Sequence, residues 1–84
     1  MNALDNQSIP LPARLTLADA ALAYANALTQ EHHITALTRA MLDDGIADKA
    51  ETNAMLIEAH IAVNAASTHL AVCAYEASLH VIPE

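Results

Sequence analysis

The sequence predicts an all-α protein built as one long helical hairpin. Hydrophobic residues make up 55% of the 84 residues, but Phe and Trp are absent and much of the excess is alanine, a small residue that favours helices. One glycine and three prolines leave little room for loops. Apolar residues recur at alternating spacings of three and four, the period of a packed helix. We therefore expect helices at about residues 16–43 and 48–82, within a single domain spanning residues 14–84.

Residues 1–13 are expected to form an extended N-terminal arm. The segment is polar at first and then contains Pro10 and Pro12. Proline disfavours the α conformation in the residue before it. The same segment lacks a basic stretch followed by an apolar run, so we expect no secretory signal peptide.

The first helix is expected to begin at Thr16. Threonine is a favourable N-cap, and Asp19 supplies an acid in the first turn. The apolar pattern is interrupted at residues 29–33, which include His32 and His33. Because that segment holds no glycine or proline, one continuous helix is favoured over two helices separated by a kink. The polar segment is interpreted as a solvated turn of that helix.

A helix stop signal and a helix start signal follow each other closely. Gly45 is suited to end the first helix in the left-handed conformation, with Ile46 and Met41 completing a Schellman motif. Asp48 and Glu51 have the spacing of a capping box that begins the next helix. Together the two signals predict a tight hairpin connection.

The second helix, expected to end before Pro83, carries a stripe of large apolar residues at packed-helix spacing. The stripe consists of Ile57, Ile61, Val72, Tyr75 and Leu79. We expect it to form the core or a dimer contact, because two helices alone leave one apolar stripe uncovered. Pairing of two hairpins into a dimeric four-helix bundle would cover it. Beside the stripe lies a polar strip that consists of Asn53, His60, Asn64 and Ser67. This strip either sets the register inside such a bundle or faces solvent.

Four side chains that can bind metals share one face of the second helix. They are His69, Cys73, Glu76 and His80. Their spacing is compatible with zinc or another transition metal, and the sequence indicates no other cofactor. The alternative interpretation is a half-solvated face in which Cys73 is a small buried residue. Because the four residues extend over three turns, one ion would reach only two or three of them.

The motifs favour a binding protein over an enzyme. Cys73 has neither a flanking glycine turn nor a helix N-terminus to activate it. Ser67 and Ser78 lie inside a predicted helix, where no strained turn exposes them. The chain also contains no glycine-rich phosphate loop.

The charge balance indicates the kind of partner. Ten acidic residues against three basic ones disfavour direct contact with nucleic acid or anionic membranes. Polar residues interrupt every apolar stretch, so we expect no membrane span and a cytoplasmic location. A protein with a basic surface fits this charge. The expected contacts are the acidic residues around the turn: Asp43, Asp44, Asp48 and Glu51.

The outline of the chain resembles small acidic bacterial proteins and phage-encoded inhibitors of similar size. This outline consists of a proline-containing arm, two alanine-rich helices and an acidic turn between them. The outline includes no diagnostic motif, so no residue role follows from it. The leading hypothesis is a non-enzymatic protein that homodimerises and binds a protein partner as a regulator, adaptor or inhibitor. The alternatives are a metal-binding or metal-sensing bundle and a structural assembly subunit.

Overall fold

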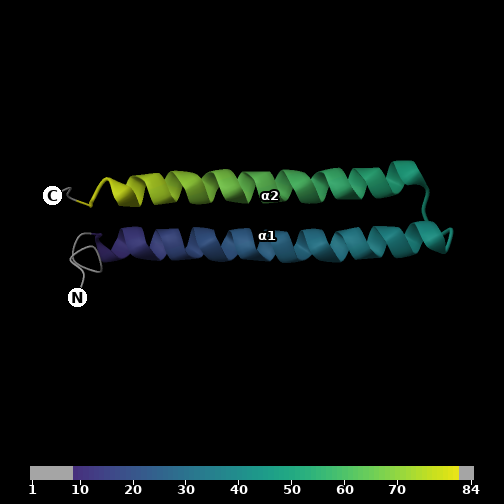
Figure 1. Cartoon of the computed structure of the whole chain (residues 1–84), viewed down its shortest axis with the longest axis horizontal. Coiled ribbons are helices and arrows are strands. Elements are labelled where there is room, and N and C mark those ends of the chain that lie inside the picture. The colour runs from purple at the N-terminus through teal and green to yellow at the C-terminus, as the bar shows by residue number, and fades with distance from the viewer. Residues whose placement is uncertain (1–8, 82–84) are drawn as a thin grey trace.

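The computed structural model describes residues 9–81 and consists of two antiparallel helices that lie side by side (Figure 1). Helix α1 comprises Leu11–Asp43 and helix α2 comprises Lys49–Ser78. The molecule measures 59 Å along its axis and 20 Å across. The predicted all-helical hairpin is therefore confirmed. Most of the expected arm (residues 1–8) and the C-terminal residues 82–84, including Pro83, lie outside the described residues.

Helix α1 begins at Leu11, not at Thr16 as predicted. Pro12 lies in the first turn of the helix. A backbone N–H at this position would have no acceptor within the helix, so a proline here costs no hydrogen bond. Pro10 precedes the helix, and its carbonyl accepts a hydrogen bond from the backbone N–H of Arg14. The Thr16 hydroxyl donates to the Pro12 carbonyl one turn earlier, so it is not a cap. The prolines that suggested an extended arm mark the start of the helix instead.

Helix α1 continues without a break through residues 29–33, as predicted. The hydroxyl of Thr29 donates to the carbonyl of Ala25, and that of Thr35 donates to the carbonyl of Glu31. These polar groups are satisfied within the helix, so they do not interrupt it. His32 and His33 are exposed, which agrees with a solvated segment.

The predicted end of α1 is confirmed by its hydrogen bonds. Gly45 adopts the left-handed conformation, with φ of 69°. Its N–H donates to the Leu42 carbonyl at 3.2 Å, and the Ile46 N–H donates to the Met41 carbonyl at 2.9 Å. These two bonds define a Schellman motif and satisfy carbonyls that the helix end leaves free.

The predicted start of α2 is also confirmed. The Asp48 carboxylate accepts from the Glu51 N–H at 2.8 Å, and the Glu51 carboxylate accepts from the Asp48 N–H at 3.2 Å. This reciprocal pair is a capping box. At its other end, α2 stops at Ser78 and not near residue 82. The N–H groups of His80 and Val81 bond to carbonyls three residues earlier, so the chain leaves the helix through a tighter turn.

The interface between α1 and α2 consists of buried and half-buried residues at alternating spacings of three and four. On α1 these are Ala13, Leu17, Ala20, Tyr24, Ala27, Glu31, Ile34, Thr38 and Met41. On α2 they are Thr52, Leu56, Ala59, Val63, Ala66, Leu70, Cys73 and Ala77. We call this set the hairpin interface. Its fully buried members are Ala, Thr and Cys, so the two backbones approach closely without large core residues.

The stripe of large residues predicted on α2 does not form the core of the hairpin. Ile57, Ile61, Val72, Tyr75 and Leu79 are between 50% and 65% exposed. Helix α2 contains two apolar repeats on different faces, and the repeat of smaller side chains packs against α1. The repeat of larger side chains remains at the surface. Its predicted role as a dimer contact stays a prediction.

Candidate functional site

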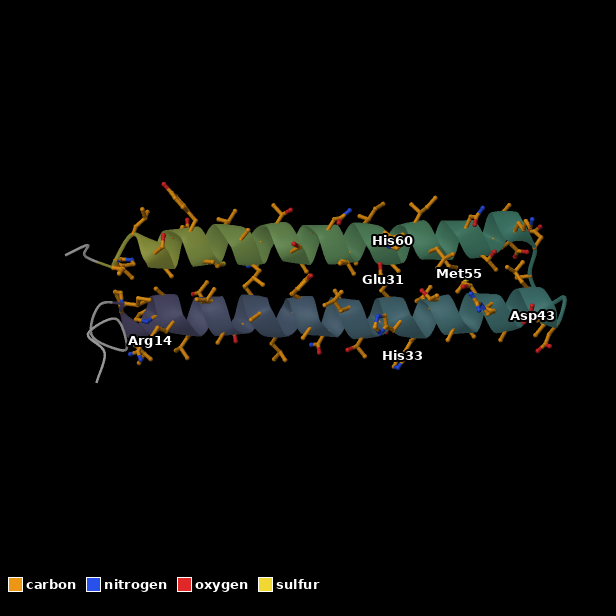
Figure 2. All side chains as sticks on the ribbon, in the orientation of Figure 1. Arg14, Glu31, His33, Asp43, Met55 and His60 are labelled. Atoms are coloured by element: carbon orange, nitrogen blue, oxygen red, sulfur yellow. The ribbon has the colours of Figure 1, made fainter. Side chains whose placement is uncertain are left out.

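The exposed apolar residues of α2 form one continuous face, which we call the outer face. It consists of Ile57, Ile61, Ala65, Thr68, Val72, Tyr75 and Leu79. On a helical wheel at 100° per residue, its mean direction lies about 180° from the hairpin interface. Figure 2 shows a row of side chains along the edge of α2 that points away from α1. Helix α2 is thus apolar on two opposite sides, and α1 covers only one of them.

The middle of the outer face is hollowed. A shallow groove there is lined by Ile61, Asn64, Ala65, Thr68, His69 and Val72. Larger exposed side chains lie beyond the groove along the helix: Ile57 towards one end, and Tyr75 and Leu79 towards the other. From position 57 to position 79 the face is about 33 Å long. A contiguous apolar surface of this length is typical of an interaction site.

The two flanks of the hairpin are more polar than the outer face. Asn53, His60 and Ser67 project from α2 on one flank, and all three are exposed. His69 and Glu76 lie towards the other flank. The polar strip predicted beside the apolar stripe therefore faces solvent in the hairpin.

One polar contact joins the two helices across the first flank. His60 Nδ1 contacts Glu31 Oε2, and the two residues lie near each other in Figure 2. Glu31 belongs to the hairpin interface, with 18% of its side chain exposed, whereas the His60 side chain is 63% exposed. The imidazole thus gives a half-buried carboxylate a partner. Residue spacing within either helix contains no signal for this pair, because its members come from different helices.

Helix α1 exposes leucines in two separate groups. Leu11, Leu15 and Leu22 lie near its start, whereas Leu37 and Leu42 lie near the turn. The residues between these groups include the polar segment 29–33. Neither group forms a continuous face comparable with the outer face of α2.

The four acidic residues predicted as partner contacts are all exposed at the turn end of the molecule. Asp48 and Glu51 bond to each other's backbone in the capping box. Asp43 is the last residue of α1 and Asp44 is its C-cap, and the last turn of this helix holds no basic residue. Carboxylates at a helix C-terminus face the negative end of the helix dipole, which disfavours them. This turn therefore presents a local concentration of negative charge.

The four predicted metal ligands differ in their exposure to solvent. Cys73 lies in the hairpin interface at 5% exposure, whereas His69, Glu76 and His80 are exposed. His69 Nε2 lies 3.7 Å from Cys73 Sγ. Among residues 9–81, no group of three His, Cys, Asp or Glu side chains is arranged to hold an ion. The structure brings together one pair of candidate ligands, while a structural zinc ion takes four.

Helix α2 is long and apolar enough, by length and composition, to cross a membrane. This finding corrects the expectation that polar residues interrupt every sufficiently long stretch. One such helix is weak evidence for a span, because a mostly buried core helix of a soluble protein meets the same criteria; here 11% of the apolar stretch is buried in the hairpin. His60, Asn64 and His69 would also be unfavourable in the hydrocarbon core.

The chain matches no protein-family model, and the searches of curated proteins and of solved structures found no match. Its function is therefore inferred from its residues and geometry alone.

Proposed function

We propose that the protein is a non-enzymatic helical hairpin that pairs with a second copy through the outer face of α2. We further propose that the pair binds another protein as a regulator, adaptor or inhibitor. The observation that best supports pairing is the exposure of large apolar side chains along α2, in a molecule whose fully buried residues, among those described, are all small. Surfaces of this kind are typical of protein–protein contacts.

The outer face can supply the free energy for moderate association. Burying the exposed half of one large apolar side chain contributes about 1 kcal/mol, since complete burial contributes roughly 1.5–3 kcal/mol. Five such side chains from each copy contribute on the order of 10 kcal/mol, against an estimated association cost of about 4–15 kcal/mol. Because this gain and this cost are of similar size, the proposed pairing is expected to be weak and to dissociate on dilution.

Sedimentation equilibrium on matched variants tests the pairing. Val72→Asp places a charge on the outer face, whereas Ser67→Asp places the same charge on a flank. We expect Val72→Asp to be monomeric and Ser67→Asp to dimerise like the wild type, with both retaining the wild-type circular dichroism spectrum. A Val72→Asp protein that dimerises as strongly as the wild type would show that this face is not the contact.

We place the contact with the protein partner at the acidic turn. Exposed carboxylates there favour a basic surface through electrostatic attraction. The double variant Asp43→Lys/Asp44→Lys reverses local charge outside the capping box, so the fold should be retained. We expect it to capture less of any partner that the immobilised wild type retains from lysate. Equal capture would remove the acidic turn from the proposal.

Metal binding is the second candidate function, and the contact between His69 and Cys73 favours it. A second copy would have to supply the remaining ligands. Zinc added to untagged protein should then raise the melting temperature of the wild type but not that of His69→Ala. Equal responses would argue against this candidate.

A further inference from the structure

We infer that the second copy docks antiparallel to the first, with α2 against the partner's α2 and a two-fold axis close to Thr68. This inference rests on the proposed function, because it specifies the geometry of the proposed pairing. Three features of the structure support it: the direction of the outer face, the order of side-chain sizes along it, and the location of the acidic residues.

The direction of the outer face places α2 in the centre of the assembly. This face points away from α1, so a copy bound to it contacts α2 alone. A square four-helix bundle would instead need an apolar flank that both helices of the hairpin share. The flanks carry exposed His60 on one side and exposed Glu76 on the other, and the apolar groove that both helices share on a flank extends only over residues 55–62 of α2. The four helices therefore form a layer, with the two copies of α1 on the outside.

Two pairs of large side chains on the outer face lie symmetrically about Thr68, whereas Val72 is matched by Asn64. Ile61 and Tyr75 are each seven residues from Thr68, and Ile57 and Leu79 are each eleven residues from it. An antiparallel arrangement brings Ile61 beside the partner's Tyr75 and places the two hollow segments together at the axis. Small side chains at a helix crossing allow a short distance between the helices. The central groove and the larger ends can thus both be filled by a second copy.

The acidic residues favour the same orientation. The exposed carboxylates of Asp43, Asp44, Asp48 and Glu51 all lie at one end of the hairpin. A parallel pair would bring the two clusters together. An antiparallel pair separates the turns by about 70 Å, because each turn lies about 34 Å along α2 from Thr68. That separation far exceeds the Debye length of about 8 Å at physiological salt, so repulsion between the clusters disappears.

Disulfide cross-linking distinguishes the two orientations. Cys73→Ala removes the native thiol, and Ile61→Cys, Tyr75→Cys and Thr68→Cys are each made in that background. A disulfide requires Cα atoms within about 7 Å of each other. In the antiparallel pair the two copies of position 61 are about 21 Å apart along the helices, whereas position 61 lies beside position 75 of the partner. Thr68→Cys, at the axis, is the matched control because it should cross-link in either orientation.

We expect Thr68→Cys to cross-link to itself. The mixture of Ile61→Cys and Tyr75→Cys should yield several-fold more cross-linked dimer than either variant alone. The mass of this dimer should equal the sum of one Ile61→Cys chain and one Tyr75→Cys chain. Efficient self-linking of both single variants would overturn the antiparallel orientation while leaving the dimer intact. A dimeric Thr68→Cys protein that does not cross-link would overturn the assignment of the outer face. If the wild type itself is monomeric, the proposed function fails.

Discussion

At the scale of single residues, the connection between the helices depends on one backbone conformation. Gly45 has a positive φ, and no atom lies within 4 Å of where a Cβ would stand. Substitution therefore strains the backbone without causing a clash.

We expect Gly45→Ala to lower the free energy of unfolding by about 1 kcal/mol, because an L side chain disfavours the left-handed conformation. Gly45→Asn should lower it less, since asparagine tolerates this conformation better. Urea unfolding monitored by circular dichroism measures both changes. An alanine variant as stable as the wild type would contradict the assigned Schellman motif.

The capping box gives a second prediction for a single residue. Asp48→Ala removes the acceptor for the Glu51 N–H, so we expect a loss of about 1 kcal/mol. Asp48→Ser keeps an N-cap oxygen and should retain most of the stability. The same unfolding experiment compares the two variants, and equal losses would mean that the cap does not stabilise α2.

These local features are the ones that could be predicted from the sequence in detail. The bonds at Gly45 and Asp48 join residues only a few positions apart, so local residue types determine them. The pair of Glu31 and His60 could not be predicted in this way. It joins positions 29 residues apart, and it forms only after the helices have packed in one register.

At the scale of the helices, the sequence predicts that two helices form but not which face of α2 joins them. Both apolar repeats of α2 have the required period. Large side chains such as Ile61 and Val72 normally fill cores, so the period alone did not show that they would remain exposed in the hairpin. In the structure, the fully buried positions of the hairpin interface hold Ala, Thr and Cys, which let the backbones approach, a tertiary effect that periodicity does not show. The start of α1 was misplaced for a related reason, since Pro12 is compatible with either an extended arm or a first helical turn.

Because the helices approach closely, larger side chains in the hairpin interface should lower the stability of the hairpin. Ala20 is 2% exposed in the hairpin interface, so Ala20→Leu should destabilise the hairpin by about 1–3 kcal/mol through overpacking. Ala18→Leu, at an exposed position of the same helix, is the matched control and should be nearly neutral. Thermal unfolding compares the pair. Equal stability of the two variants would contradict the closely packed interface.

At the scale of the whole molecule, the structure combines a well-determined hairpin with an apolar face that its own helices leave open. The outer face accounts for the high proportion of hydrophobic residues in a chain with so small a core. Its apolar character was evident from the sequence. Its direction, opposite α1, emerged only from the structure, and the proposed layered pair rests on this direction.

Native mass spectrometry of the untagged wild-type protein over a dilution series tests the central claim most directly. The proposed pairing predicts a metal-free species of twice the 8.9 kDa chain mass at high concentration, which gives way to the single chain on dilution. Val72→Asp, measured alongside, should remain at the mass of one chain throughout. A folded wild-type monomer at every concentration would contradict the claim that a second copy covers the outer face.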